Sequence, residues 1–406
     1  MKFEKNIVEY SIAGIPLIGN LTTGYTIGLT KRAKELCHKA FLEDIPDEEF
    51  KSLDKNLYTS IKTKLANPNY PLPKTDAYIH VTNNCNLECR GCYSASSSDI
   101  HVADISYKRL CMALDSISER IDKLIISGGE PFLRKDLAKI VHHAYCNCKI
   151  HSITILSNGT AINSADLHAL KPYLECISIS IDAWPKNTAP SIRGTNSFDQ
   201  ILRSIDLIKK AQIPLHFVSI ITPLNYLHLK DFILFANRHH ATISFSLLSP
   251  TPNSKLDEDL KFTHNQLVEL GRIIASNLDY ASKNQSFMDA AFPKSISTIN
   301  RCGIGTKTIT IGSDGYIYPC HLLYSQKYKM PLNAEYEISC DKYPSVEEIP
   351  ECKPCPYKYV CGGGCRARAL NEYGSVKRKD PYCAFIKEFY RIRFSELAIS
   401  IQNGGE

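Results

Sequence analysis

Six short apolar segments, rich in β-branched residues, constrain the fold of this chain more than any other feature. They are Ala77–Thr82, Lys123–Ser127, Ser152–Ser157, Cys176–Ile181, Leu215–Ile221 and Thr242–Leu248. Strands that are buried on both faces have this composition. Helical patterns lie between them, shown by the repeats Leu110, Leu114, Ile117, Ile121 and Phe198, Ile201, Ile205, Ile208. The alternation predicts an α/β fold with a parallel sheet and right-handed crossovers.

Three cysteines follow the first of these segments at the spacing C-x-x-x-C-x-x-C: Cys85, Cys89 and Cys92. A [4Fe–4S] cluster needs one ligand per iron, so three thiolates leave one iron free for another ligand. Zinc would need a fourth His or Cys, and this loop offers none. Disulfides need an oxidising compartment. Sixteen cysteines without a signal-peptide pattern favour metal ligation in a reducing cytoplasm.

A second motif, Gly128-Gly129-Glu130-Pro131, follows the next predicted strand. With the cysteine loop, it resembles the signature of radical S-adenosylmethionine (radical SAM) enzymes. The resemblance implies an open, partial (β/α)6 barrel in which the free iron chelates SAM. Reductive cleavage of SAM then gives a 5′-deoxyadenosyl radical, and Gly128, Gly129, Glu130 and Pro131 hold the amino group of SAM.

Further segments resemble the same family. Leu156–Thr160 resembles the turn after its third strand, and Ile179–Asp182 its fourth-strand motif. By this resemblance, Ser180 and Arg193 contact the SAM carboxylate. Gly91 departs from the pattern, because many relatives have an aromatic residue before the third cysteine; Tyr93 or backbone groups then contact the adenine. No general base can be named from the sequence.

Seven C-terminal cysteines form an ordered array that resembles the SPASM domain, a module with two auxiliary iron–sulfur clusters. The family pattern implies a distal cluster on Cys352, Cys355, Cys361 and Cys383, and a nearer one on Cys302, Cys320 and Cys365. A zinc ribbon remains an alternative for Cys352, Cys355, Cys361 and Cys365. The nearer set lacks a fourth cysteine, and Cys340 is one candidate. The other cysteines are predicted to be small buried side chains or surface thiols: Cys37, Cys111, Cys146, Cys148 and Cys176.

Residues 1–66 are predicted to form a separate small α+β unit. Short strands are expected at Val8–Ile12, Leu17–Ile18 and Tyr25–Gly28, and helices at Arg32–Phe41 and Asp47–Leu65. We expect Pro16 to make the second strand an edge or a very short piece, and Asp47 to cap the last helix. The unit resembles the winged-helix leader-recognition element of peptide maturases, which binds a leader by strand addition. An ordinary N-terminal cap is the alternative.

The expected domains are therefore residues 1–66, a linker at 67–73, the radical SAM core at 74–290 and the SPASM domain at 291–406. The resemblance implies an enzyme that matures a ribosomally synthesised peptide (RiPP), by a thioether or carbon–carbon crosslink. It also implies SAM, three [4Fe–4S] clusters and a flavodoxin- or ferredoxin-type electron donor. An anaerobic sulfatase-maturase-like enzyme and a non-catalytic iron–sulfur scaffold remain alternatives. A net charge of +6 without an aromatic-rich basic run does not favour nucleic acid, and no apolar run predicts a membrane span.

Overall fold

A computed structural model describes most of the chain. The described residues are 1–67, 75–95, 104–182, 192–194, 198–254, 256–277, 285–287, 302–304, 308–332 and 343–404. Within these ranges, no helix is both long and apolar enough to cross a bilayer.

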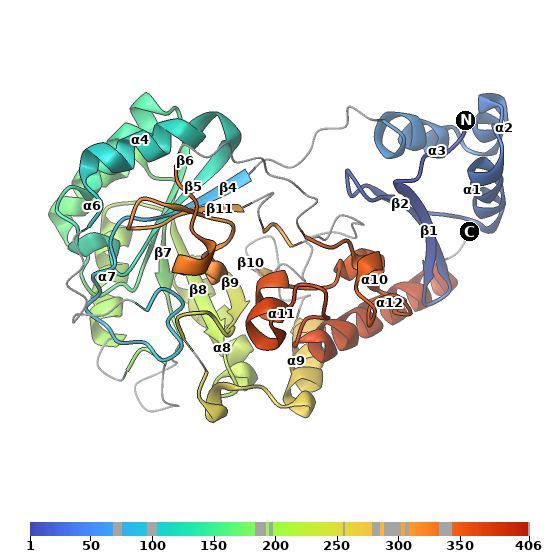
Figure 1. The fold of residues 1–406 in the computed structure, drawn as a ribbon. Coiled ribbons are helices and arrows are strands. Elements are labelled where there is room, and N and C mark those ends of the chain that lie inside the picture. The colour runs from blue at the N-terminus through green and yellow to red at the C-terminus, as the bar shows by residue number, and fades with distance from the viewer. Residues whose placement is uncertain are drawn as a thin grey trace.

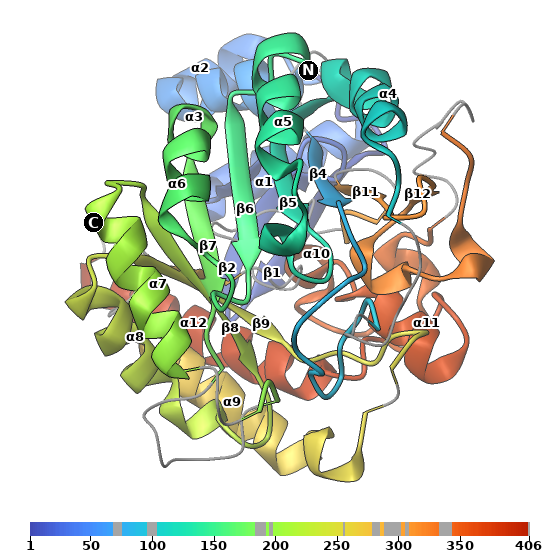
Figure 2. The same ribbon diagram turned by 90° about the vertical axis from the view of Figure 1, so that its left-hand side faces the viewer.

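A mostly parallel sheet forms the centre of the molecule (Figure 1). Its six middle strands are parallel neighbours in chain order: β4 (Thr75–His80), β5 (Ile121–Ser127), β6 (Ser152–Ser157), β7 (Cys176–Ser180), β8 (Leu215–Ile221) and β9 (Thr242–Leu247). The connecting helices are α4 (Tyr107–Ile117), α5 (Leu137–His142), α6 (Ser164–Leu170), α7 (Phe198–Lys210) and α8 (Leu229–Arg238). They cover the outer face of the sheet (Figure 2). The prediction of an α/β partial barrel is confirmed.

The sheet extends past both ends of this six-stranded core. At one edge, β10 (Gln285–Phe287) pairs parallel with β9; at the other, β11 (Thr308–Ile311) pairs parallel with β4. A hairpin then joins β11 to β12 (Ile317–Tyr318), and Asp314 and Gly315 lie in the turn between them. The C-terminal part of the chain therefore begins as a strand of the central sheet.

One predicted helical repeat ends earlier than expected. Ile121 was grouped with Leu110, Leu114 and Ile117, but α4 ends at Ile117 and a short 3-10 turn, Ser118–Arg120, leads into β5. Ile121 is instead the first residue of β5. An apolar side chain at this position would be buried in a helix or in a strand, so the spacing of Ile121 alone did not distinguish α4 from β5.

The N-terminal unit has its own small core. Its antiparallel sheet has the order β1 (Ile7–Ile12), β2 (Ile15–Asn20), β3 (Thr26–Gly28), packed by α1 (Lys31–Leu42), α2 (Asp47–Leu53) and α3 (Lys55–Ser60). Phe50 is fully buried in this core. The predicted strands and the first helix are confirmed.

Three details of the N-terminal prediction are wrong. The single helix expected at Asp47–Leu65 is divided at Asp54 into α2 and α3, and a π-helical turn, Ile61–Leu65, follows. Pro16 lies in the central strand of the small sheet, opposite Ser11 and just beyond the end of β3. Its missing N–H is tolerated there because it falls at the strand end, while its carbonyl accepts from the Leu29 N–H at 2.9 Å. Asp47 does not cap α2, because it is already the first helical residue after Pro46. Asp54 is the capping residue: it ends α2 and accepts hydrogen bonds from the first turn of α3.

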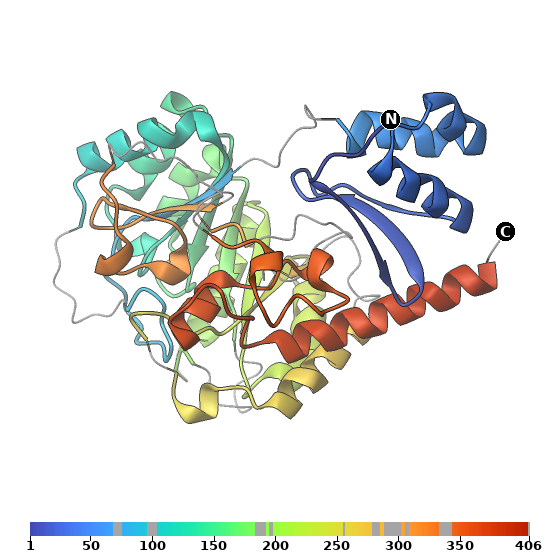
Figure 3. The same cartoon turned by 45° about the vertical axis from the view of Figure 1, so that its right-hand side comes forward.

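The C-terminal region adds α10 (Lys358–Cys361), α11 (Arg366–Tyr373) and the long α12 (Cys383–Gly404). Helix α12 packs along α9 (His264–Asn277) and then passes the tip of the β1–β2 hairpin (Figure 3). Gly271 permits the first contact, because a Cβ there would lie 2.8 Å from the Phe385 carbonyl oxygen. Tyr10 of β1 packs on Tyr359 with ring centroids 5.2 Å apart, which joins the N-terminal unit to the C-terminal region.

Candidate active site

A cavity of about 190 Å³ lies at the carboxyl ends of the central strands. Chemistry-bearing side chains concentrate at this edge in parallel α/β folds. The structure brings most of the predicted site residues together in its wall: Cys85, Cys89, Cys92, Gly128, Gly129, Ser180 and Arg193. These residues come from four different segments of the chain, so their convergence is a property of the fold.

The three cysteines lie in an irregular loop after β4. The Cys92 N–H donates to the Cys89 carbonyl at 3.2 Å, and Asn158 Nδ2 lies 3.7 Å from the Cys85 sulfur. Burial raises the pKa of Cys85, and it raises that of Cys89 to about 11. Iron would replace these thiol protons, since a coordinating thiol is deprotonated. Three thiols that face one cavity fit a cluster with one open iron.

The Gly128–Gly129 turn is packed directly against the backbone of the cysteine loop. Gly129 N–H donates to Thr82 O at 2.7 Å, and Glu130 N–H donates to Asn84 O at 2.8 Å. Gly128 has a φ of 140°, and a Cβ on Gly129 would lie 2.1 Å from Asn84 O. No side chain fits at either position, so the two glycines set how closely β5 approaches the cysteines.

Replacing Gly129 with alanine is therefore expected to displace the cysteine loop. Overpacking of this kind costs roughly 1–3 kcal/mol, so we expect the affinity for SAM to fall about tenfold. Gly28→Ala is the matched control, because a Cβ there meets nothing within 4 Å. Equilibrium dialysis of SAM against both reconstituted variants measures the effect. Equal affinities would contradict the role assigned to the close contact.

Glu130 and Pro131 do not line the cavity. Glu130 is fully buried, and its carboxylate accepts from Ser157 Oγ at 2.8 Å and from the Asn158 N–H at 2.7 Å. Burial raises the pKa of the Glu130 carboxyl group, although these hydrogen bonds act to lower it. Pro131 begins a short 3-10 turn. The Glu130 side chain thus ties β5 to the end of β6, and only its backbone remains near the cysteine loop.

Ser180 and Arg193 both lie on the cavity wall. Asp182 forms an ion pair with Arg193 and accepts from the Ile220 N–H at 2.9 Å, so the guanidinium is held on the end of β8. Burial opposes the charge on Arg193, but Asp182 and the Cys89 sulfur outweigh it and raise the pKa of the guanidinium. A fixed cation beside Cys89 suits a carboxylate ligand.

Aromatic residues form another part of the wall. The Tyr93 hydroxyl lies 3.1 Å from His80 Nε2, and its ring packs edge-on against His321. Burial lowers the pKa of His80 to about 3 and that of His321 to about 4, so both imidazoles are neutral at pH 7. Gly91 has a φ of 76°, and a Cβ there would lie 3.1 Å from Leu248. Leu248 and Leu256 therefore leave little room for a side chain at position 91.

The distal cysteine set converges on a separate small cavity, lined by Cys352, Cys355, Cys361 and Cys383. Arg366, which is 2% exposed, lies beside it, and Arg366 Nε and Nη2 have no hydrogen-bond partner among the described residues. A buried cation with unused donors requires an anionic neighbour. An iron–sulfur cluster on four thiolates is such a neighbour, so these residues fit one.

The nearer set also comes together. Cys302 and Cys365 share a hydrogen bond that lowers the pKa of Cys302 and, with burial, raises that of Cys365. Cys320 lies in the same apolar cluster. Tyr343 lies close to Cys320 and Cys302. Cys340, the suggested fourth ligand, lies outside the described residues.

Comparison with known proteins identifies the core. Residues 79–237 match the model of the Radical SAM superfamily. This segment of the chain is therefore similar to radical SAM enzymes, as its motifs indicate. Members of this family bind SAM and one [4Fe–4S] cluster, which agrees with the donor set in the cavity.

The proteins similar to this chain include one that is named as a maturase. Mycofactocin maturase MftC of Mycobacterium tuberculosis is 25% identical over 320 residues, which are 75% of this chain and 81% of the relative. The structure of anSMEcpe with bound AdoMet has a TM-score of 0.63 and 20% identity, covering 82% of this chain and all of that one. SuiB of Streptococcus suis has a TM-score of 0.59 and 16% identity, covering 94% of this chain and all of that one. These likenesses confirm the fold and the resemblance to peptide maturases.

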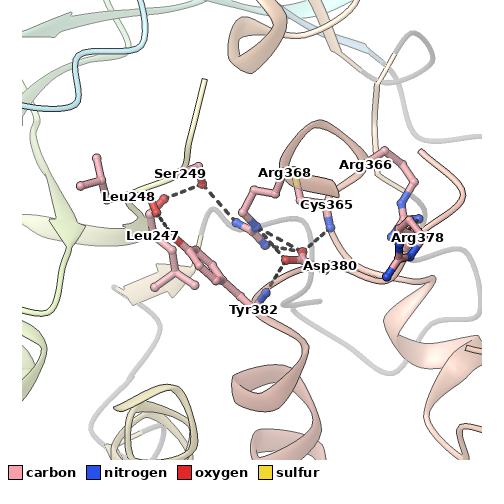
Figure 4. A network of polar contacts seen from close by, with 9 residues as sticks. All are labelled: Leu247, Leu248, Ser249, Cys365, Arg366, Arg368, Arg378, Asp380 and Tyr382. Carbon is pink, nitrogen blue, oxygen red and sulfur yellow. Dashed lines mark hydrogen bonds and ion pairs between the residues drawn. The ribbon is translucent and has the colours of Figure 1, made fainter. Parts of the chain in front are cut away.

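A buried polar network that the sequence did not indicate links the radical SAM cavity to the nearer cysteine set (Figure 4). Asp380 pairs with Arg368 at 2.7 Å and accepts from the Cys365 N–H at 2.6 Å. Arg368 also reaches Ser249 Oγ at 3.5 Å, and Ser249 lines the cavity after β9. Asp380 lines the distal cysteine cavity as well. Asp380 therefore contacts the surroundings of the nearer and distal cysteine sets, and Arg368 and Ser249 link it to the radical SAM cavity.

Proposed function

We propose that this protein reductively cleaves SAM to a 5′-deoxyadenosyl radical and modifies a ribosomally synthesised peptide. The observation that carries the proposal is the single cavity shared by Cys85, Cys89 and Cys92 with Gly128, Gly129, Ser180 and Arg193. When bound, a reduced [4Fe–4S] cluster supplies the electron that splits the sulfonium of SAM. We further propose a flavodoxin- or ferredoxin-type protein as the source of that electron.

The chain's own groups bind and orient SAM. Arg193, fixed by Asp182, offers a charged donor to the SAM carboxylate, and Ser180 offers a hydroxyl on the same wall. The Gly128–Gly129 backbone approaches closely because no side chain intervenes. The buried wall formed by Tyr93 and His321 limits water near the reacting centre, as radical chemistry needs.

The N-terminal unit supports a peptide as the substrate. A structure of SuiB was solved with its precursor peptide SuiA. The likeness to SuiB covers 94% of this chain. The remaining 6% is shorter than residues 1–66, so the likeness includes part of the N-terminal unit. In this chain, β1 is an edge strand, and with α1 it lines a hollow of about 900 Å³ that includes Lys34 and His38. We propose that this hollow binds the leader segment of the precursor by strand addition.

The pairing pattern identifies the backbone groups that face this free edge. Ile12 and Ile15 form the pair that closes the hairpin across a two-residue turn. Counting back along β1 from Ile12, every second residue therefore exchanges backbone hydrogen bonds with β2. Glu9 and Ser11 fall between these pairs and direct their backbone N–H groups outward. Proline at position 9 would remove one of these donors.

We expect Glu9→Pro to bind the precursor about five- to tenfold more weakly than Glu9→Ala, because one hydrogen bond contributes roughly 1 kcal/mol. Glu9→Ala is the matched control, since it loses the same contacts to Lys34 and His38 but keeps the N–H. Fluorescence anisotropy measures the effect with a labelled precursor, encoded by a short reading frame beside the gene. Identical affinities would count against strand addition at β1.

We propose two auxiliary [4Fe–4S] clusters on the C-terminal cysteines, and a thioether or carbon–carbon crosslink as the product. Such clusters can accept the electron left after bond formation. The nearer set of Cys302, Cys320 and Cys365 leaves one ligand position for a substrate thiolate, which suits thioether formation. Incubation with SAM, reductant and precursor, followed by mass spectrometry, tests this. The crosslink requires that the peptide lose two hydrogen atoms; an unchanged mass after SAM cleavage would contradict it.

A sulfatase-maturase-like activity is the second candidate, favoured by the likeness to anSMEcpe. Such enzymes resemble this chain but carry an aspartate base directly after the cysteine equivalent to Cys320. Here the residue is His321, a neutral imidazole on the cavity wall. Conversion of a cysteine-containing sulfatase peptide to formylglycine would favour this candidate over the crosslink.

A further inference from the structure

A group of three side chains with metal-binding chemistry lies outside the cysteine sets described above. Asp115 is near the end of α4, His143 begins a π-helical turn that continues α5, and Cys148 ends that turn. One potential ligand atom from each residue lies within 4.8 Å of the others. His143 Nε2 is 2.7 Å and Cys148 Sγ 3.3 Å from the same oxygen, Asp115 Oδ1.

These separations are close to those of a tetrahedral zinc site. With bond lengths of about 2.0–2.3 Å to nitrogen, oxygen and sulfur, ligand atoms of such a site lie about 3.3–3.7 Å apart. The carboxylate oxygen would have to move away from the imidazole nitrogen by less than about 1 Å to match. Asp115 is 56% exposed, so its carboxylate is free to make this adjustment, whereas the His143 side chain is only 16% exposed and is held in place.

The π-helical turn is a second, independent observation. In an α-helix, residues five apart point in directions about 140° apart around the axis, which would separate His143 from Cys148. The π turn instead bonds the Cys148 N–H to the His143 carbonyl at 3.1 Å. It thereby stacks the two side chains on the face that meets α4. Such turns are rare and frequently mark functional sites.

The position of the group separates it from the radical chemistry. Asp115 lies at the end of α4 that leads into the start of β5, and Cys148 lies just before the start of β6. The group is therefore at the amino ends of the strands, opposite the edge that carries Cys85–Cys92. In barrels of parallel strands, that end serves stability.

We propose that Asp115, His143 and Cys148 bind a borderline divalent transition metal ion, zinc above all, at a three-ligand site that joins two elements of the fold. Nitrogen, oxygen and sulfur ligands together are typical of zinc. Water completes the tetrahedron. Cys111 lies one helical turn before Asp115 and close to Cys148, but its thiol interacts with Tyr107. The ion joins α4 to the π turn, two elements that the chain connects only through β5 and α5. Cys148 is then a ligand, in contrast to the small buried side chain or surface thiol expected from sequence.

Zinc content tests the proposal in full-length protein whose iron–sulfur clusters have been reconstituted. After dialysis against buffered Zn²⁺, zinc and iron are measured together by mass spectrometry. We expect one zinc per chain in the wild type, and affinities at least about 100-fold weaker in Cys148→Ser and His143→Gln. Cys146→Ser and His142→Gln are the matched controls, because they remove a neighbouring thiol and a neighbouring imidazole outside the group.

Zinc should also raise the melting temperature of the wild type and both controls, but not that of Cys148→Ser. Equal zinc in the wild type and Cys148→Ser would overturn the proposal, as would equal loss of zinc in Cys146→Ser or a zinc-free wild type. If Cys148→Ser loses iron and is therefore misfolded, Asp115→Asn and His143→Gln decide, since both preserve side-chain size. None of these measurements depends on SAM cleavage, so failure here leaves the proposed function untouched.

Discussion

Replacing Cys85, Cys89 and Cys92 together with alanine is expected to abolish SAM cleavage and to remove about a third of the iron, because this is one of the three clusters that we propose. The three thiols face one cavity, whereas Cys352, Cys355, Cys361 and Cys383 line another, so the two sites should assemble largely independently. Iron analysis after anaerobic reconstitution, with a 5′-deoxyadenosine assay, measures both effects.

The matched control for this variant is Cys176→Ala, which removes a thiol at the start of β7, outside all three sets. It should keep full iron and full activity. Loss of all iron in the triple variant would show that the clusters do not assemble separately. Retention of all iron would show that these cysteines hold none.

The second large effect is expected at the buried pair of Arg368 and Asp380, whose side chains are 2% and 1% exposed. Arg368→Met should lower the free energy of unfolding by roughly 3–5 kcal/mol, because removing one partner leaves a buried charge without compensation. The Asp380 carboxylate also accepts a hydrogen bond from the Cys365 N–H. Iron retention by the C-terminal cysteines should therefore fall together with stability.

Denaturant unfolding under anaerobic conditions measures this change. Glu258→Gln is the control: it breaks the exposed pair with Lys261, and such pairs contribute about 0–1 kcal/mol. If Arg368→Met were as mild as the control, the network in Figure 4 would not be a stabilising link between the cavity and the cysteine sets.

Most of the central fold could be predicted from sequence, because strands buried on both faces are marked by composition alone. Ser152–Ser157 and Leu215–Ile221 are β6 and β8 to the residue. The errors arose where tertiary pairing decided the outcome. Pro16 is tolerated in a central strand only because β3 ends beside it. The addition of β11 to β4 joins segments that are far apart in the chain, and no local pattern marks such a pairing.

The candidate site shows the same division. The Cys85–Cys92 loop could be recognised from sequence, since its spacing is a local property, whereas the division of the C-terminal cysteines into two sets followed from the family resemblance. The supporting groups could not be predicted: Asp182, just after β7, fixes Arg193, and Arg366 and Asp380 lie beside the distal set only in the folded chain. Polar residues that follow the carboxyl ends of parallel strands were the available signal for Asp182 and Ser249.

Reductive cleavage of SAM tests the central claim most directly. The reconstituted protein is reduced anaerobically and incubated with SAM, and 5′-deoxyadenosine is quantified by chromatography, beside the Cys85, Cys89, Cys92 triple variant. We predict that the wild type forms 5′-deoxyadenosine over repeated sampling and that the triple variant forms none. Absence of 5′-deoxyadenosine from fully iron-loaded, reduced wild type, with or without precursor, would contradict the account and leave an iron–sulfur peptide-binding scaffold in its place.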